Sequence, residues 1–153
     1  MKFRKSPRLE NFDYVGPFAY SLTLVTHDRA PLFTDPGVVD ATLHCLTRSC
    51  SRHGFSLHAY CFMPDHLHLL VSGEDDSSLK DAVHHFKQLS GHRYKREHGA
   101  SLWQISYYDH VLRKDEDLPA AARYIWDNPL RAGLVQDRSE YSFSGPGSLL
   151  EQA

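Results

Sequence analysis

The sequence predicts an α+β fold with the element order β-α-β-β-α-β, followed by one further helix. Three kinds of local signal predict it: stretches in which apolar and small polar residues alternate, capping residues that begin and end two long helices, and a proline-containing turn between adjacent strands. This is the split β-α-β, or ferredoxin-like, order. It gives an antiparallel sheet with its two long helices on one face.

The first strand and helix follow from alternation and capping. Residues 17–26 alternate aromatic and aliphatic side chains with small polar ones, which is typical of a strand. Asp35 followed by Pro36 matches an N-cap with proline in the first turn, so we expect a helix that runs to about Arg52. Gly54 ends it.

A hairpin follows this helix. Residues 55–63 and 66–73 are two apolar stretches of strand length, and only Pro64 and Asp65 separate them. A connection this short permits only a tight turn, so the two strands are expected to pair antiparallel.

The second half of the chain predicts a helix, a strand and a helix. Capping residues at 76–78 begin a long helix that reaches about Glu97 and is closed by Gly99. Residues 103–113 suit a fourth strand. Acidic residues at 115–117 then favour the start of a last helix, which Pro129 must end or disturb.

Length and composition predict one globular domain over residues 1–145, with a flexible tail over residues 146–153 and little order after about Ser142. No apolar stretch approaches the roughly 18 residues of a membrane span, so we expect no membrane association. Three cysteines without zinc-type spacing predict reduced thiols in a cytoplasmic protein. The formal net charge of −2 excludes a protein that coats nucleic acid indiscriminately.

Positive charge is nevertheless clustered in the second long helix. Residues 84–98 carry Lys87, Arg93 and Arg96 with few acidic neighbours. Such a basic face on a near-neutral protein suits a small nucleic-acid site, in which these side chains contact phosphates. The alternative is a solvated helix face that binds nothing.

Two histidines stand in the predicted strand over 66–73. His66 and His68 are two residues apart, so both imidazoles leave the sheet on the same side. Two neutral imidazoles that converge on one point can bind a metal ion. The alternative is a pair of surface histidines without a ligand.

The predicted last helix carries a second pair of residues with functional side chains. Tyr124 and Asn128 are four residues apart, which places them on one helix face. A carboxamide oxygen can serve as a further metal ligand, and a phenolate is a competent nucleophile toward phosphorus. The alternative for Tyr124 is half-buried packing, and core packing is our interpretation of Trp103 and Trp126.

Four stretches together resemble a known family. The chain is similar to the single-tyrosine transposases with a His-hydrophobic-His element, and most similar to their REP-associated branch. The resemblance covers about residues 8–145. The stretches that carry it are Tyr60–Val71, Leu102–Gln104, Tyr108–Arg113 and Tyr124–Val135.

The resemblance implies a fold, a chemistry and a site. His66 and His68 match the metal pair of the family, Asn128 matches the amide that completes the site, and Tyr124 matches the nucleophile. It implies a metal-dependent endonuclease and strand transferase, which cuts single-stranded DNA next to a hairpin through a 5′-phosphotyrosine intermediate. The expected cofactor is Mg²⁺ or Mn²⁺, and ligand type alone leaves zinc open.

The expected partner is single-stranded hairpin DNA, bound by a monomer or a homodimer. Lys87, Arg93 and Arg96 are the expected phosphate contacts on the second long helix, and Arg113 is a further one at the end of the fourth strand. Two alternatives remain: a regulator that binds a DNA hairpin without cutting it, and a metal-dependent nuclease in which water attacks the phosphate.

Overall fold

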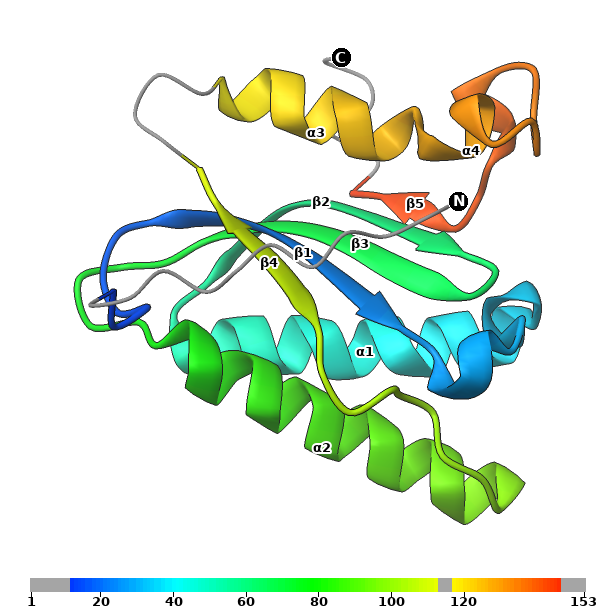
Figure 1. Cartoon of the computed structure of the whole chain (residues 1–153), viewed down its shortest axis with the longest axis horizontal. Coiled ribbons are helices and arrows are strands. Elements are labelled where there is room, and N and C mark those ends of the chain that lie inside the picture. The colour runs from blue at the N-terminus through cyan, green and yellow to red at the C-terminus, as the bar shows by residue number, and fades with distance from the viewer. Residues whose placement is uncertain (1–11, 113–116, 147–153) are drawn as a thin grey trace.

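A computed structural model describes residues 12–112 and 117–146 of the chain, and Figure 1 shows three layers: two long helices, a sheet, and a second helical layer. The sheet has five strands in the order β4-β1-β3-β2-β5. The α-helices and strands are β1 (Ala19–Val25), α1 (Pro36–His53), β2 (Ser56–Met63), β3 (His66–Ser72), α2 (Leu79–His98), β4 (Tyr108–Val111), α3 (Leu118–Trp126), α4 (Asn128–Arg131) and β5 (Ser144–Gly145). Short 3₁₀ turns lie at His27–Arg29, Leu32–Thr34 and Arg138–Glu140.

The predicted fold class is confirmed. The strand pairs that connect β1, β2, β3 and β4 are all antiparallel, and their order is that of the split β-α-β pattern, with β5 added at one edge. Helices α1 and α2 cover one face of the sheet, as the sequence predicts, and α3 and α4 lie over the other (Figure 1).

Local capping explains why the two long helices begin and end where they do. The Asp35 side chain accepts a hydrogen bond from the Gly37 N–H at the start of α1, and Gly54 ends this helix with a left-handed φ of 72°. Ser78 caps α2 by accepting from the Asp81 N–H. These caps match the sequence prediction to within a residue.

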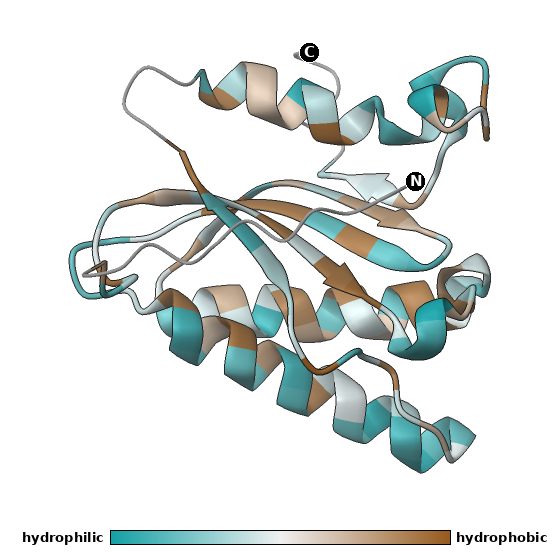
Figure 2. Cartoon of the chain, viewed as in Figure 1, coloured by the Kyte–Doolittle hydropathy of each residue, from teal (hydrophilic) through white to brown (hydrophobic). Residues whose placement is uncertain are grey.

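Two hydrophobic cores lie on opposite faces of the sheet. The larger one packs the α1 and α2 side chains against strand residues such as Leu67 and Leu69. The smaller one packs Ile125 and Trp126 of α3 against Cys61 and neighbouring residues. Figure 2 shows hydrophobic residues concentrated in the strands, while hydrophilic residues are prominent along α2. Since each face has its own core, both helical layers are held firmly to the sheet.

The fourth strand is shorter than the predicted 103–113 stretch. Only Tyr108–Val111 pairs with β1. Trp103 instead bridges to Thr26 beyond the end of β1, and the Lys87 ammonium donates to the carbonyl oxygens of Gln104 and Ile105 at 2.8 and 2.9 Å. These contacts draw the segment toward α2 and away from regular pairing.

The prediction that order is lost after about Ser142 was wrong. Residues Ser144–Gly145 form β5 against β2, and the Phe62 N–H donates to the Phe143 carbonyl at 2.8 Å. The Trp126 indole also donates to the Gly145 carbonyl, at 2.8 Å. Residues 147–153, which hold most of the predicted flexible tail over 146–153, lie outside the described residues, as does Arg113.

Among the helices within residues 12–112 and 117–146, none combines the length and the apolar character that a membrane crossing needs.

Candidate active site

The histidine pair lies on the sheet face that α3 and α4 cover. Strand alternation sends Leu67 and Leu69 into the core beneath α1 and α2, so His66 and His68 emerge on the opposite face. Their ring centroids are 4.7 Å apart and the rings are nearly perpendicular, at 89°. The two imidazoles therefore lie next to each other on one face of the sheet, as the alternation in the sequence predicts.

Each imidazole is held at its Nδ1 atom by a neighbour. Asp65 Oδ1 lies 2.7 Å from His66 Nδ1, and Thr23 Oγ1 lies 3.0 Å from His68 Nδ1. Thr23 is placed there by sheet register, since it pairs directly with His68 across β1 and β3. If Nδ1–H donates to these oxygens, Nε2 becomes the nitrogen that can bind a metal, which is the usual arrangement around metal-bound histidines.

Burial keeps both histidines neutral. It is the main cause of the lowered pKa of His66, against which the hydrogen bond to Asp65 acts. Burial is the main cause that lowers the pKa of His68 to about 3, the proximity of His66 disfavours a second proton on the pair, and the positive charge of Arg131 acts in the same direction. A metal binds only the neutral imidazole, so both side chains are in the required state at physiological pH.

The tyrosine and the asparagine come from two short helices and not from one. Helix α3 ends at Trp126, and α4 begins at Asn128, directly before Pro129. The sequence predicted that Pro129 would disturb this helix, and the break separates the environments of the two residues. Tyr124 is 65% exposed, whereas Asn128 is 4% exposed.

Asn128 is an unsatisfied polar group. Its Nδ2 atom is buried and makes no hydrogen bond within the described residues. A buried N–H group without an acceptor is costly, and an acceptor such as a phosphate oxygen of a bound substrate would relieve this cost. A cation would bind the carboxamide oxygen of Asn128 instead. Asn128 lies at the start of α4, which covers the same side of the sheet as the histidines, and its carboxamide oxygen makes it a candidate third metal ligand.

The donor set fits a divalent cation. In residues 12–112 and 117–146, no group of three or more His, Cys, Asp or Glu side chains is arranged to hold a metal. A set of His66, His68 and the Asn128 carboxamide is not of that kind, because one of its donors is an amide oxygen. Nitrogen and oxygen donors of this type suit Mn²⁺ or Mg²⁺, and the two imidazoles also suit zinc.

The predicted DNA contacts lie elsewhere. Lys87, Arg93 and Arg96 are on α2, in the layer on the other side of the sheet from the histidines (Figure 1). The Lys87 ammonium is engaged by two carbonyls, Arg93 forms an ion pair with Glu97 at 3.3 Å, and Arg96 is exposed. The structure therefore does not bring these side chains to the catalytic candidates, and their role toward DNA stays a prediction.

Sequence reasoning missed three residues at the site: Asp65, Thr23 and Arg131. Asp65 directly precedes His66, so the sequence alone could have indicated a carboxylate that binds the His66 ring. Thr23 is identified only by the register of β1 against β3. The Arg131 guanidinium stacks on the exposed Tyr124 ring, with its central carbon 3.8 Å from the ring centroid.

Comparisons with known proteins agree with this geometry. Residues 15–128 match the family model described as "Transposase IS200 like". A Haemophilus influenzae protein named as a REP-associated tyrosine transposase is 28% identical over 147 residues, which cover 86% of this chain and 81% of that protein. The REP-associated tyrosine transposase of Escherichia coli K12 is 26% identical over 106 residues, covering 66% of this chain and 60% of that protein.

Two solved structures are also similar. A REP-associated tyrosine transposase bound to a REP hairpin superposes with a TM-score of 0.74 at 19% identity, over 93% of this chain and 82% of that chain. A crystal structure from Deinococcus radiodurans R1, described as that of a transposase, gives a TM-score of 0.55 at 26% identity, over 79% of this chain and 97% of that chain. The first shows a shared fold, and the matched family model spans both the histidine pair and the tyrosine helix. The chain therefore belongs to the IS200-like transposase family.

Proposed function

We propose that this transposase cuts single-stranded DNA next to a hairpin and joins new ends, with Tyr124 as the nucleophile. The family assignment supports DNA strand transfer as the reaction, and both curated relatives are named tyrosine transposases. The relative with the higher TM-score was solved with a REP hairpin bound, which supports hairpin DNA as the partner.

One observation carries the proposal. The sheet face that holds His66 and His68 is the face covered by the two helices that bear Tyr124 and Asn128. The candidate nucleophile and the candidate metal site thus share one side of the molecule, although they are almost 60 residues apart in the sequence. Surface histidines without a ligand and a packing tyrosine would not be expected to share one side of the molecule.

The chemistry follows from the groups present. The Tyr124 hydroxyl loses its proton and attacks the scissile phosphorus, the bond from phosphorus to the 3′ oxygen breaks, and that oxygen leaves as a 3′-hydroxyl. The product is a 5′-phosphotyrosine. Because the new ester retains the energy of the broken one, a 3′-hydroxyl can attack it in turn, release Tyr124 and join DNA without hydrolysis.

His66, His68 and Asn128 would hold the divalent cation. When bound, such a cation supplies Lewis-acid stabilisation of a non-bridging phosphate oxygen. Asp65 and Thr23 fix the imidazole orientations at the two Nδ1 atoms. The high exposure of Tyr124 suits attack on a polymer that must approach from solvent.

The test is a covalent adduct with labelled DNA. The protein is mixed with single-stranded hairpin DNA in Mg²⁺ or Mn²⁺, denatured, and separated to find protein that retains label. We expect an adduct with the wild-type chain and with Tyr94→Phe, which removes a hydroxyl from α2, and none with Tyr124→Phe or His66→Ala.

The other outcomes identify the two alternative functions. Cleavage that persists in Tyr124→Phe points to water as the nucleophile, and hence to a hydrolytic nuclease. Tight hairpin binding with neither adduct nor cleavage, across several metals and hairpins, points to a regulator that binds without cutting.

A further inference from the structure

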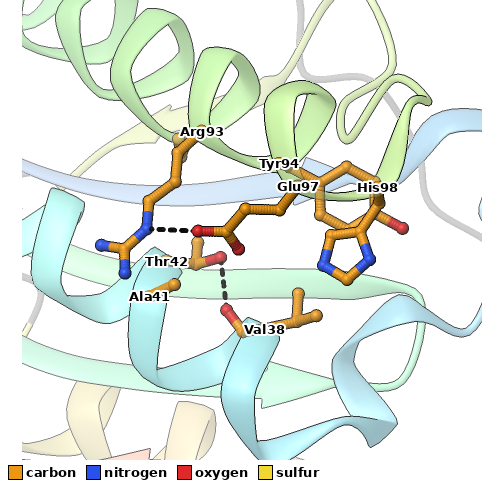
Figure 3. Close-up of a pocket in the computed structure, with 8 residues that line it drawn as sticks. Val38, Ala41, Thr42, Arg93, Tyr94, Glu97 and His98 are labelled. Atoms are coloured by element: carbon orange, nitrogen blue, oxygen red, sulfur yellow. Dashed lines mark hydrogen bonds and ion pairs between the residues drawn. The ribbon is translucent and has the colours of Figure 1, made fainter.

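The seam between α1 and α2 differs in charge between its two ends. The helices pack antiparallel over the sheet face that lies away from the histidine pair (Figure 1). At one end, the start of α1 meets the end of α2, and the Arg93 side chain pairs with Glu97 at 3.3 Å (Figure 3). This end encloses only about 10 Å³ and its arginine is neutralised.

The other end of the seam is open and carries unneutralised positive charge. There the end of α1 meets the start of α2 around a concavity of about 400 Å³. Its lining contains two arginines and no acidic residue: Thr47, Arg48, Ser51, Arg52 and His85. Within the described residues, neither Arg48 nor Arg52 takes part in a hydrogen bond or an ion pair.

The histidine of this concavity is held in place. Ser49 Oγ lies 3.0 Å from His85 Nδ1, so the ring orientation is fixed by a buried hydroxyl of α1. The His53 ring packs against it with centroids 5.0 Å apart, and His53 Nε2 is buried without a hydrogen-bond partner in the described part of the chain. Burial is the main cause of the lowered pKa of His85, and the positive charges of Arg52 and Arg48 act in the same direction.

The two exposed arginines repel each other, and a bound anion would relieve this repulsion. Arg48 and Arg52 are four residues apart on one helix face, and like charges at this spacing destabilise a helix. The dipole of α1 favours a cation in its last turn, which accounts for Arg52 but not for Arg48. A phosphate group would neutralise both, since the planar guanidinium matches phosphate oxygens with two parallel hydrogen bonds.

We propose that Arg48, Arg52 and His85 form a phosphate-binding site on the α1–α2 side of the molecule, separate from the catalytic face. The phosphate comes either from the DNA backbone or from a free phosphate ion. If the phosphate belongs to DNA, this proposal rests on the proposed function, because the site then binds a part of the DNA substrate away from the cut position. Such a contact would anchor the DNA without touching Tyr124.

The experiment compares two double variants that remove the same formal charge. Arg48→Gln with Arg52→Gln changes the site, and Lys95→Gln with Arg123→Gln, at two exposed residues outside the concavity, is the control. Fluorescence anisotropy with labelled hairpin DNA, in EDTA and at several salt concentrations, gives affinity and its salt dependence. Thermal unfolding with and without inorganic phosphate reports binding of the free ion.

We expect the site variant to bind hairpin DNA roughly 10- to 100-fold more weakly than the control, with a smaller salt dependence by about one to two released ions. If DNA affinity is unchanged but phosphate raises the Tm of the wild type and not of the site variant, the free ion is the ligand. Equal DNA affinity together with equal phosphate response in both variants overturns the proposal.

Failure of this proposal is distinguishable from failure of the proposed function. The binding measurement requires no cleavage, and the covalent adduct with Tyr124 is measured separately on the same proteins in Mg²⁺ or Mn²⁺. Loss of hairpin affinity in the site variant without any adduct in the wild type would retain the phosphate site and reject the tyrosine chemistry.

Discussion

The guanidinium carbon of Arg131 lies 3.8 Å from the centroid of the Tyr124 ring, so the candidate nucleophile carries a cation on its face. The same charge reaches the histidine pair: burial is the main cause of the lowered pKa of His68, and Arg131 contributes to it. Arg131 therefore contacts the tyrosine ring, and its charge also acts on His68. A cation at this position can orient the ring before attack and stabilise negative charge on the phosphate.

Replacing Arg131 is expected to slow formation of the covalent adduct. Arg131→Ala removes both the ring contact and the charge, and we expect a rate roughly 10- to 100-fold lower in single-turnover measurements, with hairpin affinity changed much less. Arg131→Lys keeps the charge but loses the flat guanidinium, so it should recover part of the rate. Arg123→Ala, which removes an exposed arginine of α3, is the control. A wild-type rate in Arg131→Ala would contradict this role.

Replacing Thr23 tests the support of the metal site. Thr23→Val keeps the shape of the side chain but removes the hydroxyl that lies 3.0 Å from His68 Nδ1. Because such partners orient the ligand and increase its basicity, we expect Mn²⁺ affinity to fall about 10- to 100-fold by calorimetry in the absence of DNA. Thr34→Val, in an exposed turn, should bind Mn²⁺ like the wild type. Equal affinity in Thr23→Val would show that His68 needs no such partner.

Elements with local signals were predictable from the sequence. The two long helices carry their own stop and start residues, such as Asp35 and Gly54 for α1, and the Pro64 turn leaves only a hairpin between β2 and β3. Alternation within β3 was enough to place both histidines on one face. These parts of the fold depend on residues that are close together in the sequence.

Elements that depend on distant partners were not predictable in the same way. Strand β5 has only two residues, and it exists because β2 offers an edge and Trp126 binds the Gly145 carbonyl. The role of Thr23 needs the register of β1 on β3, which alternation alone does not give. Arg131 follows Tyr124 by seven residues, which in one ideal helix places both on the same face but about 10 Å apart along the axis. Spacing therefore indicated the shared face but not the ring contact itself.

The Trp126 indole is expected to stabilise the C-terminal end of the described chain. It is 3% exposed, and its N–H donates to the Gly145 carbonyl at 2.8 Å, which ties α3 to β5. Trp126→Phe leaves this carbonyl without its donor and removes packing volume, so we expect the free energy of unfolding to fall by about 1–3 kcal/mol in urea denaturation. A change below about 0.5 kcal/mol would mean that β5 does not depend on this contact.

The three cysteines are expected to be unreactive in the folded protein. Burial raises the pKa of Cys45, raises that of Cys50 to about 11, and raises that of Cys61 to about 12 although Arg131 acts in the opposite direction. The reactive species is the thiolate. Because the pKa of each thiol is raised in the folded protein, the thiolate fraction stays small at any pH well below that pKa and grows only as the pH approaches it. At pH 8, Ellman's reagent should therefore titrate almost no thiol in the native chain and all three in denaturant. Rapid labelling of a native thiol at pH 8 would show that the core around this thiol opens readily. Single Cys→Ala variants would then identify the labelled residue as Cys61, beneath the helix that carries the tyrosine, or as one of the two thiols of α1.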